Sequence, residues 1–519
     1  MRFRSITGVA TIGAAVLAIG LPGVAGVHGR TPATPLQHRA AGNESRSPSA
    51  RSRTATGQCS SNSMTGFLGV GGASTVAAGF DSAVLGGTNN EACDDYTGIG
   101  AGEGNNVGNT SDATVRSFIG GGQNNSIGQM DAFIGAGESN SASYTESAVV
   151  TGSNNTSSGY ASLIGAGESN SASGASSSVS GGDDNAASGD TSFIGGGYYN
   201  AASGLGSAIG GGGAAYANLG GSTVSNSISG SDSFVGAGDQ NTIASIESFI
   251  GSGSINSITT SASYASILGG NRNVVTGEYA SILGGFGNSA TGPYAIVAGG
   301  DADSAAGTLT FAAGYHADAV HGGSFVWSDF HSGSAVLKDT AANQFVVRAS
   351  GGTMVYSNEA TTSGVKLAAG GGSWASLSDR NAKTGVVPLD EGSVLAKVAA
   401  LRVSAWRYKT ENGVRHVGPM AQDFYAAFGL GEDDRHITSI DEDGVALAAI
   451  KALYEDNQRL RCQNRTLQSV VERNERHRDG EFAALRSELR HLEAAVAPRV
   501  VASRHRLARE SSLRLGALP

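Results

Sequence analysis

Apolar residues recur every 15 residues along the middle of the chain, and glycine, serine and asparagine fill the positions between them. A step of 15 is too short for a helical hairpin, and these small polar residues disfavour helix. Two strands of about four or five residues, closed by Gly/Asn turns, fit one repeat. The pattern predicts a β-solenoid of about twelve coils with Ile, Val and Ala pointing inward. The expected inward positions are Ile119, Ile134, Val149, Ile164, Val179, Ile194, Ile209 and Val224, then Val235 and Ile250, and after an insertion Leu268, Leu283 and Ala298.

Such a coil has a thin core. Two or three inward apolar side chains per coil offset little of the conformational entropy that so many glycines lose on folding. Lateral association of several chains would supply the missing burial, so the pattern favours an oligomer.

The pattern changes twice after the repeats. Between 307 and 375, the short apolar runs 325–327 and 344–347 predict strands of a β-rich connector. Beyond Trp374 the composition becomes that of an ordinary globular domain, with a helix expected at 394–403 and a strand at 405–408. Over 446–497, apolar residues alternate in steps of three and four, which predicts a coiled coil. Its core positions are Ile450, Leu453, Asn457, Leu460, Asn464, Leu467 and Val471, followed after a stutter by Leu485, Leu489, Leu492 and Val496.

The ends of the chain differ from the middle. Residues 1–26, with Arg2 and Arg4 before an apolar run, predict a signal peptide for export, and 27–58 predicts a disordered spacer. We expect a secreted or cell-surface protein without a stable membrane span after signal removal. Residues 498–519 form a basic tail. The net charge is −10, and between Arg53 and Lys338 the cations are Arg116 and Arg272, which excludes nucleic-acid binding by the middle of the chain.

Three cysteines suit an exported protein. Cys59 and Cys93 are a candidate disulfide near the start of the repeats, with two unpaired thiols as the alternative. Cys462 either links chains or stays a free thiol. No Cys/His spacing matches a zinc site, and the repeats lack the Asp ligands of a calcium-binding roll, so we expect neither metal nor cofactor.

The units Ser-Phe-Ile-Gly-Gly-Gly-Gln-Asn-Asn (117–125) and Ala-Phe-Ile-Gly-Ala-Gly-Glu-Ser-Asn (132–140) carry a resemblance. They resemble the head repeats of YadA-like trimeric adhesins, and the resemblance implies a trimeric parallel β-roll over about 59–306.

A second motif begins immediately after Leu377. The run Ser378-Asp379-Arg380-Asn381-Ala382-Lys383 precedes Gly418-Pro419-Met420-Ala421-Gln422-Asp423, and an apolar helix follows. These motifs resemble the endosialidase-type intramolecular chaperone domain, the peptidase S74 family, over about 376–445. The resemblance implies a domain that trimerises, guides folding of the preceding fibre and cuts itself off at Leu377-Ser378. It makes Ser378 the nucleophile and Lys383 the general base, which must be neutral to accept a proton.

Together these patterns predict a mainly β protein: a trimeric parallel β-roll of 15-residue repeats, a β-connector, a small α+β chaperone domain and a coiled coil. The expected function is an exported homotrimeric fibre or adhesin-like protein that binds a host-surface or glycan ligand and cleaves itself. The alternatives are a non-cleaving structural fibre and a glycan-degrading solenoid. The degrading enzyme needs paired carboxylates, for which Asp183-Asp184 or Glu138 and Glu168 are the candidates. Gln422, Asp423, His416 and His436 are expected to be structural.

Overall fold

The computed structural model describes residues 67–71, 75–108, 116–213, 225–330, 333 and 335–513. They fall into two compact units, 1–196 and 197–519, and each is described by itself. The expected signal peptide (1–26), the spacer (27–58) and Cys59 lie outside the described residues, as does Val224.

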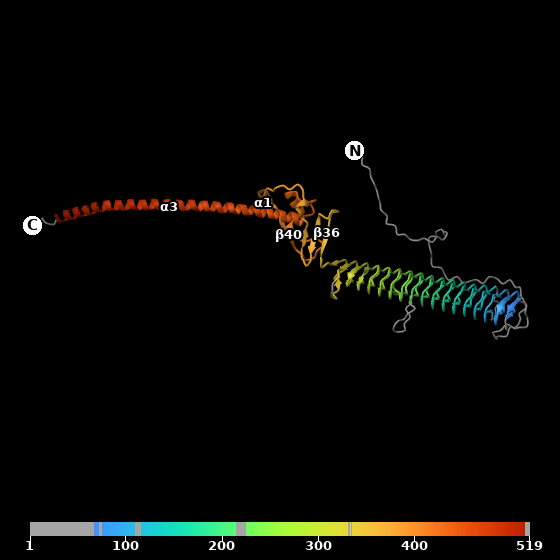
Figure 1. Ribbon diagram of the computed structural model, residues 1–519. Helices are drawn as coiled ribbons and strands as arrows, with labels where there is room; N and C mark the ends of the chain where they lie inside the picture. Colours follow the sequence, from blue (N-terminus) through green and yellow to red (C-terminus); the bar gives the residue numbers. More distant parts are fainter. Residues whose placement is uncertain are drawn as a thin grey trace, which may run out of the picture. The chain divides into compact units, whose positions relative to one another are not determined.

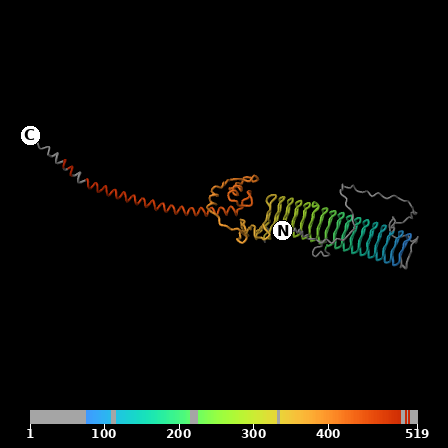
Figure 2. The backbone as a smooth tube through the Cα atoms, turned by 90° about the horizontal axis from the view of Figure 1, so that it is seen from above, coloured from blue at the N-terminus to red at the C-terminus, as the bar shows by residue number. Residues whose placement is uncertain are grey.

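Both units contain coils of a parallel β-solenoid, which has about 16 turns in all (Figure 1). Each coil gives one strand to sheet A and one to sheet B, and successive coils lie next to one another (Figure 2). Pairing is in register from coil to coil: Ile119 lies opposite Ile134 in sheet A, and Ile127 lies opposite Ala142 in sheet B. The mainly β solenoid fold predicted from the 15-residue period is therefore confirmed, although most strands are two residues long.

The strands of the two sheets divide between the units. In the first unit, sheet A comprises β1 (Phe67–Gly71), β3 (Ala83–Gly87), β5 (Gly98–Ile99), β7 (Phe118–Ile119), β9 (Phe133–Ile134), β11 (Ala148–Val149), β13 (Leu163–Ile164), β15 (Ser178–Val179) and β17 (Phe193–Ile194). Sheet B there comprises β2 (Val76–Ala77), β4 (Glu91–Ala92), β6 (Asn106–Val107), β8 (Ser126–Ile127), β10 (Ser141–Ala142), β12 (Thr156–Ser157), β14 (Ser171–Ala172) and β16 (Ala186–Ala187). In the second unit, sheet A comprises β19 (Ala208–Ile209), β21 (Phe234–Val235), β23 (Phe249–Ile250), β25 (Ser266–Ile267), β27 (Ser281–Ile282), β29 (Ile296–Asp301), β31 (Phe311–Tyr315), β33 (Phe325–Ser328) and β35 (Phe345–Arg348). Sheet B there comprises β18 (Ala201–Ala202), β20 (Ser227–Ile228), β22 (Thr242–Ile243), β24 (Ser257–Ile258), β26 (Val274–Val275), β28 (Ser289–Ala290), β30 (Ser304–Ala305), β32 (Ala317–Ala319) and β34 (Leu337–Lys338).

The inward column of sheet A follows the predicted ladder up to Ile250 and then departs from it. The predicted inward residues of the ladder from Ile119 to Ile209 are buried as expected, and so are Val235 and Ile250. In the next coil Ile267 pairs with Ile250 and is buried, whereas Leu268 is 51% exposed. The expectation that Leu268, Leu283 and Ala298 point inward was therefore wrong by one residue. The turn 259–265 is two residues longer than its counterpart 244–248, so the column moves by 17 residues from Ile250 to Ile267, and Leu268, one residue later, points to the opposite face.

A row of buried asparagines, which was not predicted from the sequence, runs beside this apolar column. Along most of the row, the carbonyl oxygen of each side chain accepts two hydrogen bonds from the next asparagine, one from its backbone N–H and one from its side-chain amide; Asn273 Oδ1 accepts the Asn288 backbone N–H. Asn155, for example, donates to Asn140 Oδ1 from both groups at 3.1 Å. Its amide also donates to the Gly167 carbonyl at 2.8 Å. The row comprises Asn90, Asn105, Asn125, Asn140, Asn155, Asn170 and Asn185 in the first unit, and Asn200, Asn226, Asn241, Asn256, Asn273 and Asn288 in the second.

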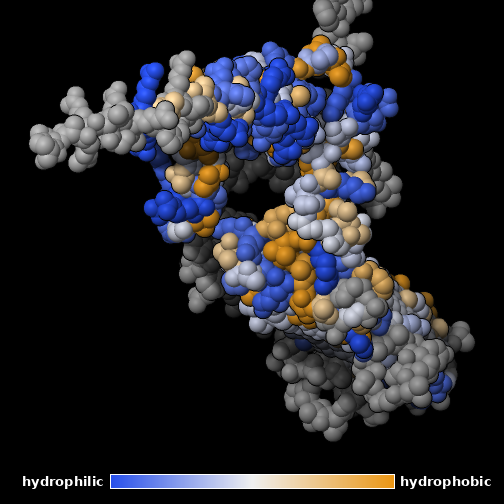
Figure 3. Space-filling view, turned by 90° about the vertical axis from the view of Figure 1, so that its left-hand side faces the viewer, coloured by the Kyte–Doolittle hydropathy of each residue, from blue (hydrophilic) through white to orange (hydrophobic). Residues whose placement is uncertain are grey.

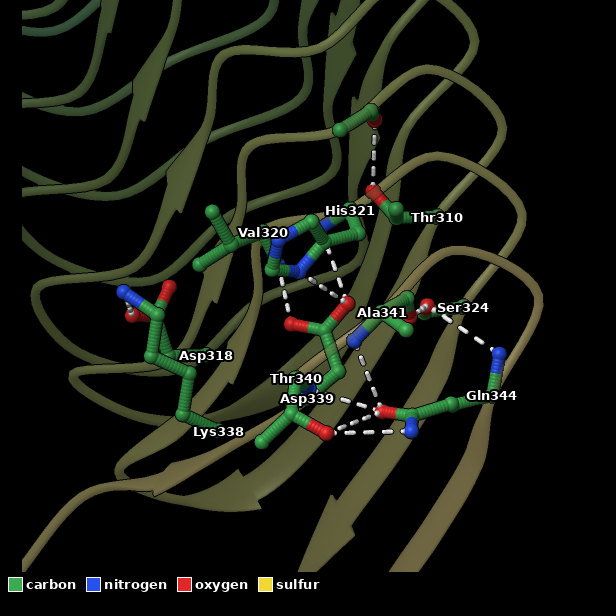
Figure 4. A network of polar contacts seen from close by, with 11 residues as sticks. Thr310, Asp318, Val320, His321, Ser324, Lys338, Asp339, Thr340, Ala341 and Gln344 are labelled. Carbon is green, nitrogen blue, oxygen red and sulfur yellow. Dashed lines mark hydrogen bonds and ion pairs between the residues drawn. The ribbon is translucent and has the colours of Figure 1, made fainter. Parts of the chain in front are cut away.

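Two buried aspartates lie near the C-terminal end of the solenoid interior. Asp303 takes the place of asparagine one coil after Asn288, and its Oδ1 accepts the Ala317 N–H at 2.7 Å. In the last coil Asp339 replaces the inward apolar residue and accepts the backbone N–H groups of Val320 and His321 at 2.7 and 2.8 Å (Figure 4). Burial raises the pKa of Asp339, but its hydrogen bonds outweigh that effect, so the net pKa is below the ordinary value. A charged, hydrogen-bonded carboxylate thus closes the apolar core.

The solenoid extends further than predicted. Residues 325–327, expected in a connector at 307–375, belong to β33, and residues 345–347 of the expected run 344–347 belong to β35. Strand β33 pairs in parallel with β31, and β35 pairs in parallel with β33. Apolar runs alone cannot distinguish a connector strand from a last solenoid strand. An antiparallel sheet of β36 (Gly352–Tyr356), β37 (Gly364–Ala368) and β38 (Trp374–Ser376) follows.

The C-terminal part is a small α/β region that precedes a long helix. It contains the 3₁₀ turn η1 (Arg380–Ala382), α1 (Glu391–Ala400), the antiparallel pair β39 (Val403–Trp406) and β40 (His416–Pro419), and α2 (Ala421–Phe428). The expected helix and strand at 394–408 are present, with boundaries two to three residues earlier. The helix α3 (Ser439–Leu513) covers the whole predicted coiled-coil segment. Near its start α3 packs on α1, where Lys451 Nζ lies 2.5 Å from Glu391 Oε1.

Candidate functional site

The candidate site lies where the antiparallel sheet of β36, β37 and β38 meets the C-terminal region. Strand β38 ends at Ser376, and the Leu377 N–H still donates to the Gly364 carbonyl of β37 at 3.0 Å. Ser378 is the first residue beyond this hydrogen-bonded edge. The Leu377-Ser378 peptide bond is therefore held on one side by a sheet and on the other by the turn that follows.

A short turn brings Lys383 back to Ser378. Asp379 caps η1, and its Oδ1 accepts the Asn381 N–H at 2.9 Å and the Asn381 side-chain amide at 3.2 Å. A residue with a short carboxylate side chain suits this position because it accepts the free N–H groups of the turn. The 3₁₀ turn reverses the chain, and Lys383 Nζ lies 2.6 Å from Ser378 Oγ. The structure therefore brings together the two predicted site residues.

This pair has the atoms that a serine–lysine nucleophile requires. An amine within hydrogen-bond distance of a hydroxyl takes its proton when the amine is neutral. Ser378 and Lys383 are exposed in the single chain, and Leu377 is also exposed. The adjoining carbonyl carbon of Leu377 belongs to the same segment, so attack on it requires no separate substrate pocket.

The other polar residues of this region make contacts of their own. His416 stacks on Trp406 with 4.7 Å between ring centroids, and its Nε2 lies 2.8 Å from Glu411 Oε2. His436 Nδ1 lies 2.9 Å from Asp433 Oδ1. A backbone hydrogen bond from Arg435 and the bond with His436 lower the pKa of Asp433. None of these described contacts is with Ser378 or Lys383.

The carboxylates considered for glycan cleavage occupy one column at a corner of the first unit. Glu138, Ser153, Glu168 and Asp183 are bridged in that order, coil after coil. Glu138 and Glu168 are exposed and separated by one intervening coil. The column repeats with the coil, so it is a regular surface feature of the solenoid.

The cysteines divide into two kinds. Cys93 is disulfide-bonded and buried, whereas Cys462 on α3 is free and exposed. The expected partner of Cys93 is Cys59, which lies outside the described residues, so this pairing stays a prediction. Among the described residues, no group of three or more His, Cys, Asp or Glu side chains is placed to hold a metal ion. No described helix is both long and apolar enough to cross a membrane.

The fold and the site define a fibre-like solenoid joined to a small domain that carries a serine–lysine pair. Comparison with protein families agrees with this class: residues 378–429 match the peptidase S74 family, described as the chaperone of endosialidase. The predicted recognition of this family is confirmed for that segment, which contains the pair and extends through α2. No curated protein matches the chain. The resemblance of the repeats to YadA-like heads stays a prediction.

Proposed function

We propose that this chain is an exported homotrimeric fibre whose C-terminal chaperone domain directs trimer folding and then cleaves the Leu377-Ser378 bond. The observation that carries the proposal is the 2.6 Å contact between Lys383 Nζ and Ser378 Oγ within the segment that matches the chaperone family. A β-solenoid followed by such a domain fits a tail-fibre-like protein. The family match suggests self-association.

The exposed surface of the C-terminal region supports assembly from several copies. In the single chain Val386, Val417 and Leu447 are 80%, 76% and 69% exposed, and Phe424 is one of few buried side chains. Apolar residues also gather on the face shown in Figure 3. A soluble domain that exposes this many large apolar side chains gains stability when other copies cover them.

Helix α3 supports the same proposal. The predicted core residues Ile450, Leu453, Leu460 and Leu467 are each more than half exposed in the single chain. Residues at this spacing share one face of a helix, and that face is covered when helices of several copies form a coiled coil. Asn457 lies in the same row, and polar residues at core positions fix register and strand number.

The proposed cleavage is a proton relay within one chain. Lys383 takes the Ser378 hydroxyl proton while Oγ attacks the Leu377 carbonyl carbon, and the proton then passes to the departing Ser378 amide nitrogen. This leaves an ester between Leu377 and Ser378 Oγ, which water hydrolyses to a Leu377 carboxylate and a free Ser378. Neighbouring copies that exclude water from the site would favour the neutral amine, so cleavage would follow assembly.

Intact mass of the purified chain tests the proposal. We expect wild type to yield a 378–519 fragment, and Ser378→Ala and Lys383→Met to remain whole. Ser376→Ala, which removes a hydroxyl two residues earlier, is the matched control and should cleave. Native mass of the Ser378→Ala protein reports assembly separately. A whole wild-type chain would refute cleavage and leave a non-cleaving fibre, and a monomeric mass would refute the trimer.

Export and the ligand of the fibre are further parts of the proposal. Residues 1–26 would direct export, and the mature fibre would act at the cell surface or after secretion, on a host-surface or glycan ligand. Fusion of 1–26 to a reporter enzyme that is active only outside the cytoplasm tests the export step. A fusion that stays inactive would refute it.

A further inference from the structure

The two outward faces of the solenoid differ sharply in chemistry. On sheet A, large apolar side chains recur in one column that includes Phe118, Phe133 and Phe193 in the first unit, and Phe234, Phe249 and Phe325 in the second. On sheet B the corresponding residues are mostly small and hydroxylated, such as Ser141, Thr156, Thr242 and Ser257. Exposed aromatic residues also lie in the turns, such as the stacked Tyr264, Tyr279 and Tyr294, but between the two sheets the outward phenylalanines lie on sheet A.

The aromatic column is exposed. Phe118, Phe133, Phe193, Phe234 and Phe249 are each about two-fifths exposed. Neighbouring rings stack, with 6.4 Å between the centroids of Phe118 and Phe133 and 5.8 Å between those of Phe234 and Phe249. Between the rings, smaller residues such as Ala148, Ser178 and Ser266 occupy the same column.

In several coils a glycine lies beside the ring. A Cβ built on Gly251 would lie 3.4 Å from the Phe249 ring, and one built on Gly236 would lie 3.5 Å from the Phe234 ring. The rings therefore lie across the glycine positions two residues later. In the coils without such a glycine, the same row holds the exposed apolar side chains of Val150, Leu268 and Leu283, so this face is apolar beyond the rings themselves.

We infer that the outward face of sheet A is where copies of this chain pack side by side, with sheet B facing solvent. This inference rests on the proposed homotrimer and names the surface that the trimer uses along the rod. A partner for this face must present apolar groups at the coil spacing over many coils. A second copy, aligned in parallel, does so coil by coil.

The column also leads toward the proposed assembly domain. In the second unit it continues through Phe311, Phe325 and Phe345, whose rings stack at 4.5 and 4.9 Å between centroids. Phe345 begins β35, the last solenoid strand, and is 76% exposed. Copies joined at the chaperone domain would thus be brought together, in the same direction and register, at the end of this face.

Site-specific photo-cross-linking of the full chain tests the inference. Phe249 is replaced by p-benzoylphenylalanine, a residue of similar shape, in the Ser378→Ala background that keeps the chain whole. The matched control carries the same residue at Thr242, on sheet B of the same coil. The mass of each intact assembly is measured by native mass spectrometry before irradiation, so assembly and contact are measured separately.

We expect both proteins to have a trimeric mass. Irradiation should cross-link chains that carry the photoreactive residue at position 249 and should not cross-link chains that carry it at position 242. Trimeric mass with cross-links at 242, or at neither position, would overturn the inference and leave the proposed trimer intact. Monomeric mass for both variants and for the unlabelled parent would overturn the proposed trimer and this inference with it. Monomeric mass for the 249 variant alone would show that the face is required for assembly, and Phe249→Leu should then restore the trimer.

Discussion

Replacing Asp303 by asparagine should make the solenoid more stable at neutral pH and remove a pH dependence from its second unit. Asp303 is 1% exposed, and its backbone N–H donates to Asn288 Oδ1 at 2.9 Å, as each asparagine of the row does. Its Oδ2, however, has no hydrogen-bond partner. A Cβ built on Gly300 would lie 2.3 Å from this oxygen, and one built on Gly285 would lie 2.6 Å from Asn288 Nδ2. The oxygen therefore takes the position that a donating amide nitrogen has in the other coils.

This geometry favours the protonated carboxyl. Burial raises the pKa of Asp303 to about 6, and Asp301 adds to the rise, whereas hydrogen bonds from Ala317 and Gly314 and the nearby His316 oppose it. Because the pKa is higher in the folded chain than in the unfolded chain, the stabilisation is complete below about pH 4. It is lost as pH rises through about 6. The difference from the ordinary value corresponds to an upper limit of about 3 kcal/mol.

Hydrogen exchange measured by mass spectrometry on peptides covering 303–319 checks this reasoning. After correction for the intrinsic pH dependence, protection in wild type should fall by up to about 100-fold between pH 4 and 7. Asp303→Asn should show constant protection, since its amide can donate as Asn288 does. Asp301→Asn, which changes a neighbouring carboxylate, is the control and should keep most of the wild-type dependence, because burial, the main cause of the raised pKa of Asp303, is unchanged in this variant. Equal pH profiles for wild type and Asp303→Asn would refute the argument.

Three further predictions concern the interior of the solenoid. Asn155→Ala should lower the free energy of unfolding by about 2–3 kcal/mol, because it leaves the Asn170 N–H and amide without their shared acceptor. Guanidinium unfolding measures this loss, and an unchanged midpoint would contradict the prediction. Gly137→Ala should cost more than Gly299→Ala, because a Cβ at Gly137 would lie 2.0 Å from a carbonyl oxygen and one at Gly299 meets nothing closer than 3.6 Å. The two glycines have similar positive φ values, 120° and 113°, so the pair separates crowding from backbone strain in a thermal melt, and equal losses would show that crowding is unimportant. Asp339→Asn should weaken the last coil above about pH 4, where wild type carries the charge that its lowered pKa favours. The variant should match wild type as pH falls below that range, and faster exchange in peptides covering 320–345 at pH 7 measures the difference.

The sequence predicted the solenoid because its buried column is periodic, but period alone could not fix the register after the insertion. Ile267 and Leu268 are both apolar, and counting 15 from later repeats fits either residue equally well. The structure selects Ile267 because its pairing with Ile250 accommodates the inserted residues in a turn. The asparagine row was visible at the same 15-residue spacing. It was missed because asparagine is also a common turn residue, and its role depends on hydrogen bonds between coils that only the stacked structure reveals.

The candidate site was predictable for a different reason. Ser378 and Lys383 are five residues apart, a spacing that carries no information by itself, and the resemblance to the chaperone family gave it meaning. The 3₁₀ turn that joins them depends on Asp379 as a capping residue, which a close inspection of the sequence can suggest. The closing role of Asp339 was beyond sequence reasoning, because it requires knowing which coil is the last.

The asparagine row and the aromatic face together explain why such a rod would need an assembly domain. Hydrogen bonds from coil to coil hold each unit along its axis, whereas the inward column is made of Ile, Val and Ala and buries little area per coil. Most large aromatic side chains described in the solenoid point outward, so much of the apolar burial still available comes from contact with other chains. A repeating face, however, fits a second copy almost equally well when shifted by one coil. A domain at one end that brings the copies together in a single register would resolve this ambiguity, and its removal by cleavage would leave the aligned rod.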